Sequence, residues 1–451
     1  MLLGSCSLTT ATGFEECKVD VDCAASSACI DNYCIRLPEG CARGPGEFKQ
    51  ADRIAFAGVL PLTDSSGVRD ESEFAGLDAF TQAIEEMNQK DGANGRRFGL
   101  YVCDTQRDGE RAETQAGWLA TELGIPAIIT SGSQQSLDVS GATRASQTFI
   151  MSATATSPEL VDQFSSNTDS LLWRTAPPDT LQGRVLANIL VNDPTYAGAT
   201  KIGIIYVNDA YGQGLSAELV KRLAGLRTTE TAPFTSGDDM SIGMAVTGLV
   251  NQMVNATVVI GVTSDTRKIL ERAFLQSALR RTSGHRWAFA DASKDPTILG
   301  VPNAVTELAG SLGTAPAQGA GSAYPTFRNA YRTRFGTDPS SFSFTSHSYD
   351  AMYLVGLSAS YATGGGRTLN GRTMADAMGK VVSTGPAVTI EPSQFSALRN
   401  TFTAGQTVNV EGNSGKLDFI PDAGAPVSPI EQWRIEGDGG FTTVQLVDPP
   451  N

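Results

Sequence analysis

The sequence lacks any uninterrupted run of eighteen apolar residues, so it predicts no helix that crosses a membrane. Basic residues are also scarce: 34 Lys and Arg stand against 48 Asp and Glu, which gives a formal net charge of -14. A chain this acidic is repelled by the phosphates of nucleic acid and by anionic lipid, so we expect neither as a direct partner. The length of 451 residues allows about three structural units of ordinary size.

Histidine is nearly absent as well. The chain contains only His285 and His347, and neither lies near a cysteine or a paired acid at the spacing of metal ligands. No G-x-G-x-x-G motif follows a strand, and the sequence YGQG is too short for a phosphate-binding loop. We therefore expect no catalytic residues, no metal site and no cofactor, so that the protein is not an enzyme.

Cysteine is concentrated near the start of the chain, where the first 41 residues hold six of the seven cysteines. This density is typical of proteins in an oxidising compartment. From Cys17 to Cys41 the spacing is C-x5-C-x5-C-x4-C-x6-C, without the tight C-x2-C pairs of zinc sites, and this favours disulfides. Five cysteines cannot all pair with one another, so we predict one disulfide from this segment to Cys103, with Cys41 as a candidate partner.

The sequence Leu3-Gly4-Ser5-Cys6 matches the end of a bacterial lipoprotein signal, in which Cys6 carries the lipid. A chance match is the alternative, because the motif is short. If Cys6 is lipidated, the remaining cysteines are even in number and suffice for three disulfides. Residues 1–52 are thus expected to form a clipped lipoprotein signal, a cysteine-rich tether and a linker (42–52), which anchor the protein to a bacterial membrane.

From residue 53 onward, apolar patterns of strand type and helix type alternate along the chain. This alternation predicts an α/β fold with parallel sheets covered on both faces, in two successive units joined near 172–176. Helices are also expected at 325–335, 348–363 and 373–381, and strands in 415–446. In the two units, the expected strands are 53–60, 98–103, 126–130, 201–207, 257–260 and 287–290, and the expected helices are 73–87, 110–123, 214–224 and 267–279.

The stretch IMSATATSPEL (150–160) marks a candidate site. A short apolar strand ends there in small hydroxyl residues, and Ser157 and Pro158 then have the pattern of a helix start. One interpretation is that the hydroxyls only cap the helix. The other is that they line a cleft and hold a polar head group, because unpaired N–H groups point outward at such a place. The position at the carboxyl end of a parallel strand favours the cleft.

Several motifs occur in a fixed order between residues 53 and 440: RIAFAGVLPLTD, DGANGRRFGLYVCD, SATATSPEL, RTAPPDTLQG, IGIIYVNDAYGQG and YRTRFGTDPSSF. Together they resemble the branched-chain amino acid binding proteins of ABC importers, which have the type I periplasmic binding protein fold. The resemblance implies two doubly wound parallel-sheet lobes, joined by three crossings, that close on a ligand by a hinge movement. Lobe 1 is expected at 53–175 plus 317–412 and lobe 2 at 177–314 plus 415–446, behind a small disulfide-rich segment.

The same resemblance implies a monomeric periplasmic protein that delivers a small ligand to an ABC transporter permease. It also implies the ligand contacts. Tyr211 is expected to line the cleft, and Asp291 to meet an ammonium group in a contact worth about 1.5–3 kcal/mol, although a helix-capping or loop role is the alternative for this Asp. The expected carboxylate contacts are Ser133, Gln134, Thr154, Ala155 and Thr156.

Two departures from the family pattern leave the ligand open. Arg69 stands at or near the place where the family often has a tryptophan, and Val262 or Thr263 where it has a tyrosine. The loss of these rings widens the cleft and removes surfaces that face a cation. Thr263 and Arg69 are therefore candidate contacts, with Arg69 either meeting an acidic ligand or remaining a solvated loop residue. The family's disulfide is also missing, since its positions fall near Arg107 and Ser133.

Three functions remain open on the sequence. The first is capture of an amino-acid-like solute for an ABC transporter. The second is the same scaffold with an apolar or lipid-like ligand, such as a sterol or hopanoid. The third is a ligand sensor that presents its bound state to a partner protein.

Overall fold

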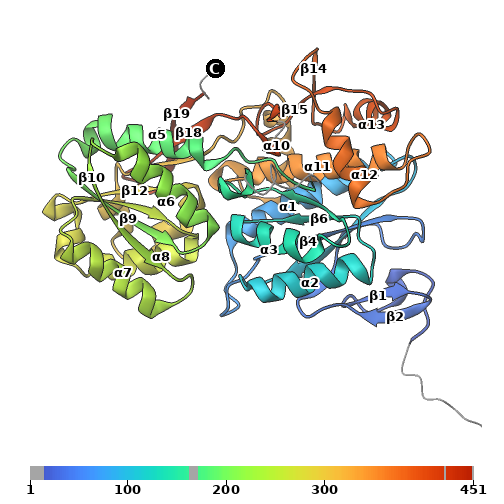
Figure 1. The fold of residues 1–451 in the computed structure, drawn as a ribbon, viewed down its shortest axis with the longest axis horizontal. Coiled ribbons are helices and arrows are strands. Elements are labelled where there is room, and N and C mark those ends of the chain that lie inside the picture. Colours follow the sequence, from blue (N-terminus) through green and yellow to red (C-terminus); the bar gives the residue numbers. More distant parts are fainter. Residues whose placement is uncertain (1–14, 162–170, 421–422, 449–451) are drawn as a thin grey trace, which may run out of the picture.

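The computed structural model describes residues 15–161, 171–420 and 423–448. It contains two α/β lobes side by side, with the N-terminal segment packed on one of them (Figure 1). Cys6 lies outside the described residues. Among the helices described, none has the length and apolar character needed to span a membrane.

The first lobe is built on a six-stranded sheet with the strand order β3-β5-β4-β6-β7-β8. All neighbouring pairs from β5 to β8 are parallel, and β3 is added antiparallel at one edge. The strands are β3 (Cys41–Gly46), β4 (Ile54–Leu60), β5 (Phe98–Asp104), β6 (Ala127–Thr130), β7 (Phe149–Ser152) and β8 (Leu172–Arg174).

Helices cover both faces of this sheet, as the continuous apolar strands predict. In β4, Ile54 and Phe56 pack in the core beneath α1 and α11, while Ala57 and Val59 pack in the core beneath α2 and α3. Late helices thus complete the lobe that the early chain begins (Figure 1). The helices are α1 (Glu71–Asn88), α2 (Gly109–Thr121), α3 (Ser133–Thr143), α10 (Tyr324–Phe335), α11 (Thr345–Ala362), α12 (Gly371–Asp376) and α13 (Phe395–Thr403).

The second lobe is built on a seven-stranded sheet with the order β10-β9-β11-β12-β13-β18-β19. The first five strands of that order are parallel, and the last two are added antiparallel from the C-terminal region. The strands are β9 (Lys201–Val207), β10 (Thr228–Phe234), β11 (Ala256–Ile260), β12 (Arg286–Phe289), β13 (Leu312–Pro316), β18 (Ile430–Ile435) and β19 (Phe441–Val447).

The helices of the second lobe include one that follows the first crossing directly. They are α5 (Asp179–Asn192), α6 (Ala210–Leu223), α7 (Asp239–Asn251), α8 (Thr263–Ala273) and α9 (Ala304–Leu308). Two small paired-strand elements lie between β13 and β18 in sequence: β14 (Ala387–Thr389) with β15 (Asn409–Glu411), and β16 (Phe419–Ile420) with β17 (Ala425–Pro426). The predicted fold class, two parallel-sheet lobes behind a disulfide-rich segment, is confirmed.

The chain passes between the lobes three times: after β8, after β13, and between β15 and β18. Buried hydrogen bonds tie these crossings together. The N–H of Arg174 donates to the carbonyl of Gly424 at 2.9 Å, and its guanidinium donates to the carbonyl of Ser157 at 2.8 Å. The hydroxyl of Thr175 donates to the carbonyl of His347 at 3.0 Å. The crossings are therefore buried and joined by hydrogen bonds.

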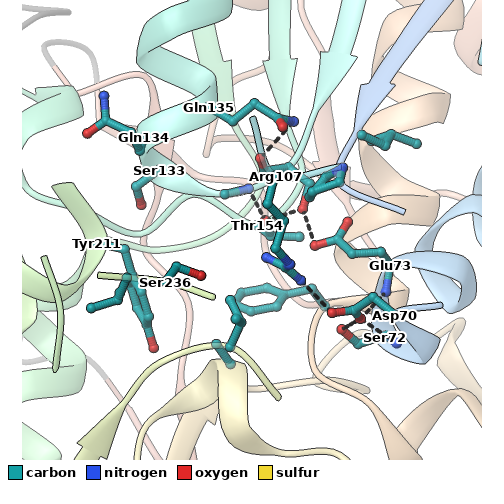
Figure 2. A pocket seen from close by; sticks show the side chains of 18 of the residues that line it. Asp70, Ser72, Glu73, Arg107, Ser133, Gln134, Gln135, Thr154, Tyr211 and Ser236 are labelled. Atoms are coloured by element: carbon teal, nitrogen blue, oxygen red, sulfur yellow. Dashed lines mark hydrogen bonds and ion pairs between the residues drawn. The ribbon is translucent and has the colours of Figure 1, made fainter. Parts of the chain in front are cut away.

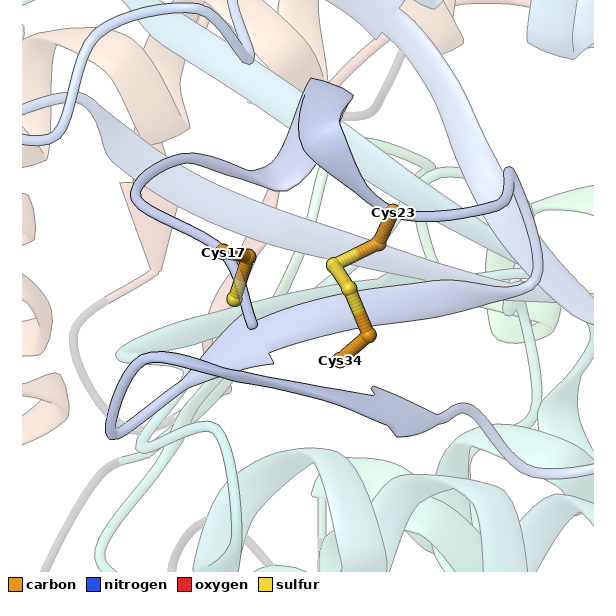
Figure 3. A group of neighbouring side chains, drawn as sticks. All are labelled: Cys17, Cys23 and Cys34. Carbon is orange, nitrogen blue, oxygen red and sulfur yellow. A yellow bond between two sulfur atoms is a disulfide. The ribbon is translucent and has the colours of Figure 1, made fainter. Parts of the chain in front are cut away.

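The N-terminal segment is held by three disulfides: Cys17–Cys29, Cys23–Cys34 and Cys41–Cys103. The predicted bridge to Cys103 is confirmed, with Cys41 as its partner. Figure 3 shows that Cys17, Cys23 and Cys34 come close together, and their sulfur atoms lie within 4.8 Å of one another. All three sulfurs belong to disulfides, which accounts for their proximity.

The predicted linker at 42–52 is wrong in its first half. Residues 42–46 belong to β3, which pairs antiparallel with β5 from Cys41 opposite Cys103. The disulfide fixes this register, and the open edge of β5 supplies hydrogen-bonding groups that would otherwise be unpaired. The segment is thus part of lobe 1 rather than a separate tether.

A buried ion pair also docks this segment onto lobe 1. The carboxylate of Asp20 is fully buried, pairs with Arg53, and accepts a hydrogen bond from the hydroxyl of Tyr101 at 2.5 Å. Its other oxygen accepts from the N–H of Cys29 at 2.8 Å. A short 3-10 turn, Asp20–Asp22, presents this carboxylate, while strands β1 (Ser27–Ile30) and β2 (Tyr33–Arg36) form the hairpin next to it.

Candidate functional site

A cavity of about 390 Å³ lies between the two lobes. Its first-lobe wall comes from the start of α1, the loop after β5, the start of α3 and the loop after β7, and its second-lobe wall from the loops after β9, β11 and β12. Figure 2 shows Glu73, Asp70 and Thr154 on one side of this space and Tyr211 and Ser236 on the other. The position is the carboxyl end of both parallel sheets, where ligands bind in open α/β folds.

Six of the nine residues predicted to contact ligand line this cavity. They are Ser133, Gln134, Thr154, Tyr211, Thr263 and Asp291. The other three, Arg69, Ala155 and Thr156, do not line it.

Thr156 and Ala155 lie behind the cavity wall, so their expected contact with the ligand carboxylate is corrected. Both residues are fully buried. The hydroxyl of Thr156 donates to Asp179 Oδ2 at 3.0 Å, and Asp179 is the first residue of α5, just after the first crossing. Ala155 packs in the core beneath α2 and α3. This part of the loop therefore belongs to the hinge.

Arg69 is also corrected. Its guanidinium carbon lies 3.3 Å from the ring centroid of Phe74, and its Nε donates to Glu71 at 3.1 Å. The Arg69 side chain is half exposed. The solvated alternative therefore describes Arg69 better than contact with an acidic ligand.

A chain of hydroxyl groups connects the loops after β6 and β7. Ser131 donates its single hydroxyl proton to Glu73 Oε1 at 2.7 Å, so the 2.8 Å contact between Ser131 and Thr154 must be donated by Thr154. The Thr154 oxygen in turn accepts from the N–H of Gly132 at 2.6 Å. The Thr154 hydroxyl is thus committed to Ser131, and its proton is not free for a ligand carboxylate.

The first turn of α3 provides the donors that remain. Gly132, with φ of 78°, turns the chain from β6 into α3 without a side-chain cap. The N–H groups of a first helical turn have no partner within the helix and favour anions. The hydroxyl oxygen of Ser133 accepts from the N–H groups of Thr156 and Ser157 at 3.2 and 3.1 Å, so it stabilises the backbone of the loop after β7. The backbone N–H groups of Ser133 and Gln134 are therefore candidate donors to a ligand carboxylate.

Gln134 connects the lobes directly. Its Oε1 accepts from the N–H of Ala210, the first residue of α6, at 3.2 Å. Its Nε2 donates to Asp138 one turn further along α3 at 2.9 Å. The side chain therefore joins the two lobes at the mouth of the cavity.

Asp291 forms the acidic end of the second-lobe wall and is almost fully buried. Its Oδ1 accepts from the hydroxyl of Tyr211 at 2.6 Å and from Nε2 of Gln182 at 2.8 Å. Burial raises the pKa of Asp291, and it raises the pKa of the neighbouring Asp179 well above its usual range. Thr263 is held nearby, since its hydroxyl donates to the carbonyl of Ala292 at 3.2 Å.

Three further charged residues in the first-lobe wall, Asp70, Glu73 and Arg107, were not predicted. Asp70 caps α1, accepting from the N–H groups of Ser72 and Glu73 at 3.0 and 3.1 Å, and it pairs with Arg107. Burial, together with the charge of Asp70, raises the pKa of Glu73 to about 7. Figure 2 shows Arg107 reaching across the cavity wall to Asp70. Arg107 was noted in the sequence only for the disulfide that the family pattern would place there.

The two-lobed fold and the cavity between its lobes define the class of bilobal ligand-binding proteins. The sequence pattern described as "Receptor family ligand binding region" matches residues 75–423, which is more than half of the chain. The chain belongs to this family, whose members bind ligands.

Relatives with described roles agree with this class. The chain is 27% identical to the chemotactic signal transduction system substrate-binding protein BasB of Halobacterium salinarum, over 82% of this chain and 84% of that protein. It is 28% identical to the Leu/Ile/Val-binding protein homolog 1 of Brucella abortus, over 40% of this chain and 46% of that protein.

Solved structures share the fold at low sequence identity. A leucine-binding protein of Thermotoga maritima superposes with a TM-score of 0.69 at 15% identity, covering 88% of this chain and 99% of that one. A branched-chain amino acid transporter substrate-binding protein of Streptococcus pneumoniae, solved with isoleucine, gives 0.68 at 17% identity, covering 88% and 100%. A solute-binding protein of Rhodopseudomonas palustris with 3,4-dihydroxybenzoic acid gives 0.66 at 14% identity, covering 89% and 98%.

Proposed function

We propose that this protein is an extracytoplasmic solute-binding protein that closes its lobes on an amino-acid-like ligand and delivers it to an ABC transporter. In this proposal lobe 1 is 53–175 plus 317–412 and lobe 2 is 177–314 plus 415–446, and Cys6 carries the lipid anchor. The three disulfides are consistent with an oxidising compartment. Relatives and structural neighbours named for leucine and branched-chain amino acid binding support the ligand class.

One observation carries the proposal: two opposite binding features face the same cavity from different lobes. The first turn of α3, in lobe 1, has N–H groups without partners within the helix, and such groups favour a carboxylate. Asp291, in lobe 2, is a buried acid held by Tyr211, and it is suited to an ammonium group. A zwitterion that bridges the two favours the closed arrangement, since only that arrangement satisfies both of its ends.

The acidic side chains in both walls favour an amino-acid-like ligand over a sterol or hopanoid. Closure on an apolar ligand would leave Asp291 and Glu73 buried without a cationic partner, which is costly. The sensor alternative is favoured by one specific observation, the similarity to BasB, a protein of a chemotactic system. The sensor and transport roles use the same cavity and differ in the partner that reads the closed form.

Isothermal titration calorimetry with a panel of amino acids tests the ligand class, and small-angle X-ray scattering tests closure. We expect binding to lower the radius of gyration. We expect Asp291→Asn to weaken amino acid binding at least ten-fold, because a hydrogen bond to a charged group contributes about 1.5–3 kcal/mol. Affinity unchanged by Asp291→Asn would contradict the proposed ammonium site.

A further inference from the structure

The walls of the cavity carry a surplus of negative charge. Among the described residues that line it, only Arg107 and Lys294 are basic, and each already has an acidic partner. Arg107 pairs with Asp70, and Lys294 donates to Glu431 at 2.7 Å, with both of these side chains buried. The acids that line the cavity are Asp70, Glu73, Asp138, Asp209 and Asp291. The described lining therefore has more acidic than basic side chains, and both basic side chains are already paired.

Two of these acids, Asp209 and Asp138, have local structural roles. Asp209 caps α6 by accepting from the N–H of Gly212 at 3.0 Å, and Asp138 accepts from Gln134. Glu73 and Asp291 instead receive only neutral hydrogen bonds from residues around the cavity, and neither forms an ion pair with any Lys or Arg of the described chain. A ligand that closes the lobes encloses both carboxylates.

The two acids come from opposite lobes. Glu73 belongs to the first turn of α1, and Figure 2 places it at the far side of the cavity from Tyr211, the residue that holds Asp291. Phe80 lies two turns further along α1 and also lines the cavity. The lining thus offers a carboxylate from each lobe, which suits a ligand with two positive groups.

The surroundings of Arg107 argue against a ligand with a second carboxylate. Arg107 pairs with Asp70 and has Glu73 as a further acidic neighbour. One guanidinium between two carboxylates leaves this end of the cavity negative, so an added ligand carboxylate would be repelled. The same field attracts a cation.

We propose that the ligand is a basic amino acid, whose α-ammonium binds Asp291, whose carboxylate binds the first turn of α3, and whose side-chain cation binds Glu73. This inference rests on the proposed function and narrows its ligand to one class. An amino acid with a neutral side chain would leave Glu73 enclosed without a positive partner, which buried carboxylates tolerate poorly. Ser131 keeps the Glu73 carboxylate turned into the cavity through its hydrogen bond.

Calorimetric titration at pH 8 with L-lysine, L-ornithine, L-arginine and L-norleucine tests this proposal. L-norleucine has the carbon chain of L-lysine without the side-chain amine, so the pair isolates the contact at Glu73. We expect the best basic amino acid to bind at least ten-fold more tightly than L-norleucine. Glu73→Gln should remove at least ten-fold of the affinity for the basic ligand and should not weaken L-norleucine binding, because it also removes the unpaired carboxylate that a neutral ligand encloses.

Glu71→Gln is the matched control, because Glu71 lies on the same helix, is largely exposed and pairs with Arg69 outside the cavity. It should leave both affinities unchanged. Circular dichroism and thermal unfolding establish that each variant is folded. Asp291→Asn should weaken all four amino acids alike, since they share the α-ammonium.

The outcomes separate this proposal from the broader one. If L-norleucine binds as tightly as every basic amino acid, or if Glu73→Gln changes both ligand types alike, the basic-ligand proposal is wrong while amino acid binding stands. If none of the four binds the wild-type protein, both proposals are wrong. Selective loss of the basic ligand in folded Glu73→Gln protein supports the assignment.

Discussion

The pKa of a carboxyl group at the edge of a closing cavity depends on the charges and the burial around it, and Glu73 is an example. Burial and the charge of Asp70 hold its pKa at about 7, so near neutral pH it is partly protonated. A bound cation favours the ionised form and lowers that pKa. Ligand binding at Glu73 is therefore coupled to proton release.

This coupling predicts a pH dependence of selectivity. Below pH 7 a side-chain cation must displace a proton from Glu73, so the ratio of L-lysine to L-norleucine affinity should fall by up to about ten-fold per pH unit. The contribution of Asp291 cancels in this ratio, because both ligands have the α-ammonium that is proposed to bind Asp291. Calorimetry between pH 8 and pH 5.5 measures it. Glu73→Gln should give a flat ratio, and a flat ratio in the wild-type protein would contradict the coupling.

His347 shows a different consequence of burial. Desolvation alone lowers the pKa of His347 to about 3, and neither ring nitrogen has a hydrogen-bond partner among the described residues. An unfolded chain protonates this histidine below about pH 6.5, while the native protein keeps it neutral. The native state therefore loses stability as pH falls from 6.5 toward 3.

His347→Leu should remove this penalty. As the pH falls from 6 to 4, the unfolding free energy of the variant should rise relative to that of wild type by about 1.4 kcal/mol per pH unit. Urea unfolding at several pH values measures the difference in unfolding free energy. The contributions of the carboxylates cancel in this difference, because both proteins contain them. His285→Leu is a useful comparison, because burial lowers the pKa of His285 to about 4. Parallel curves for variant and wild type would rule out a neutral native His347.

Among the site residues, Thr154 was predictable from its place after a strand, whereas Tyr211 and Asp291 were implied by the family resemblance. Tyr211, Thr154 and Asp291 follow strand ends, and all three line the cavity. Ser131 was missed although it directly follows β6, because the family pattern pointed two residues further on. Glu73 was missed because, three residues after the capping Asp70, it has the ordinary pattern of a helix start.

At the scale of elements, strands made of large apolar residues were predictable, and strands made of polar or small residues were not. β4 and β9 are continuous apolar runs and were predicted nearly to the residue. β10 was missed because it is an edge strand with polar, exposed positions. β13 was missed because its sequence LGTAP is small: the ring of Trp433 lies against Gly313, where an added Cβ would come within 2.2 Å of it.

The disulfide between β3 and β5 should matter for stability and not for binding. Cys41 and Cys103 join strands 62 residues apart in sequence, and neither lines the cavity. Replacing both with alanine should lower the unfolding free energy by about 2–4 kcal/mol, because the unfolded chain gains freedom. Denaturant unfolding measures this, and calorimetry with L-lysine should show unchanged affinity. A loss of affinity would mean that the N-terminal segment shapes the cavity.

At the scale of the whole molecule, the loop that first suggested a binding site has two functions. Thr154 faces the cavity and orients Ser131, while Thr156, two residues later, bonds Asp179 across the first crossing. The same short loop therefore connects the ligand-binding wall to the hinge. Sequence could place the loop at a strand end, but which hydroxyl faces which side depends on the second lobe, which folds from distant residues.

Gln134 is the residue through which closure can be tested. Its side chain joins the lobes by accepting from the N–H of Ala210 at 3.2 Å, a contact that opening would break. Gln134→Ala should weaken amino acid binding about two- to ten-fold, since a neutral hydrogen bond contributes about 0.5–1.5 kcal/mol. The loss should appear in the dissociation rate, because encounter with the open form does not use this contact. Stopped-flow kinetics with L-lysine separates the association rate from the dissociation rate.

Gln445→Ala is the matched control, because it removes a 2.7 Å hydrogen bond to Gln432 within one lobe. Equal dissociation rates for Gln134→Ala and this control would show that Gln134 does not hold the lobes closed.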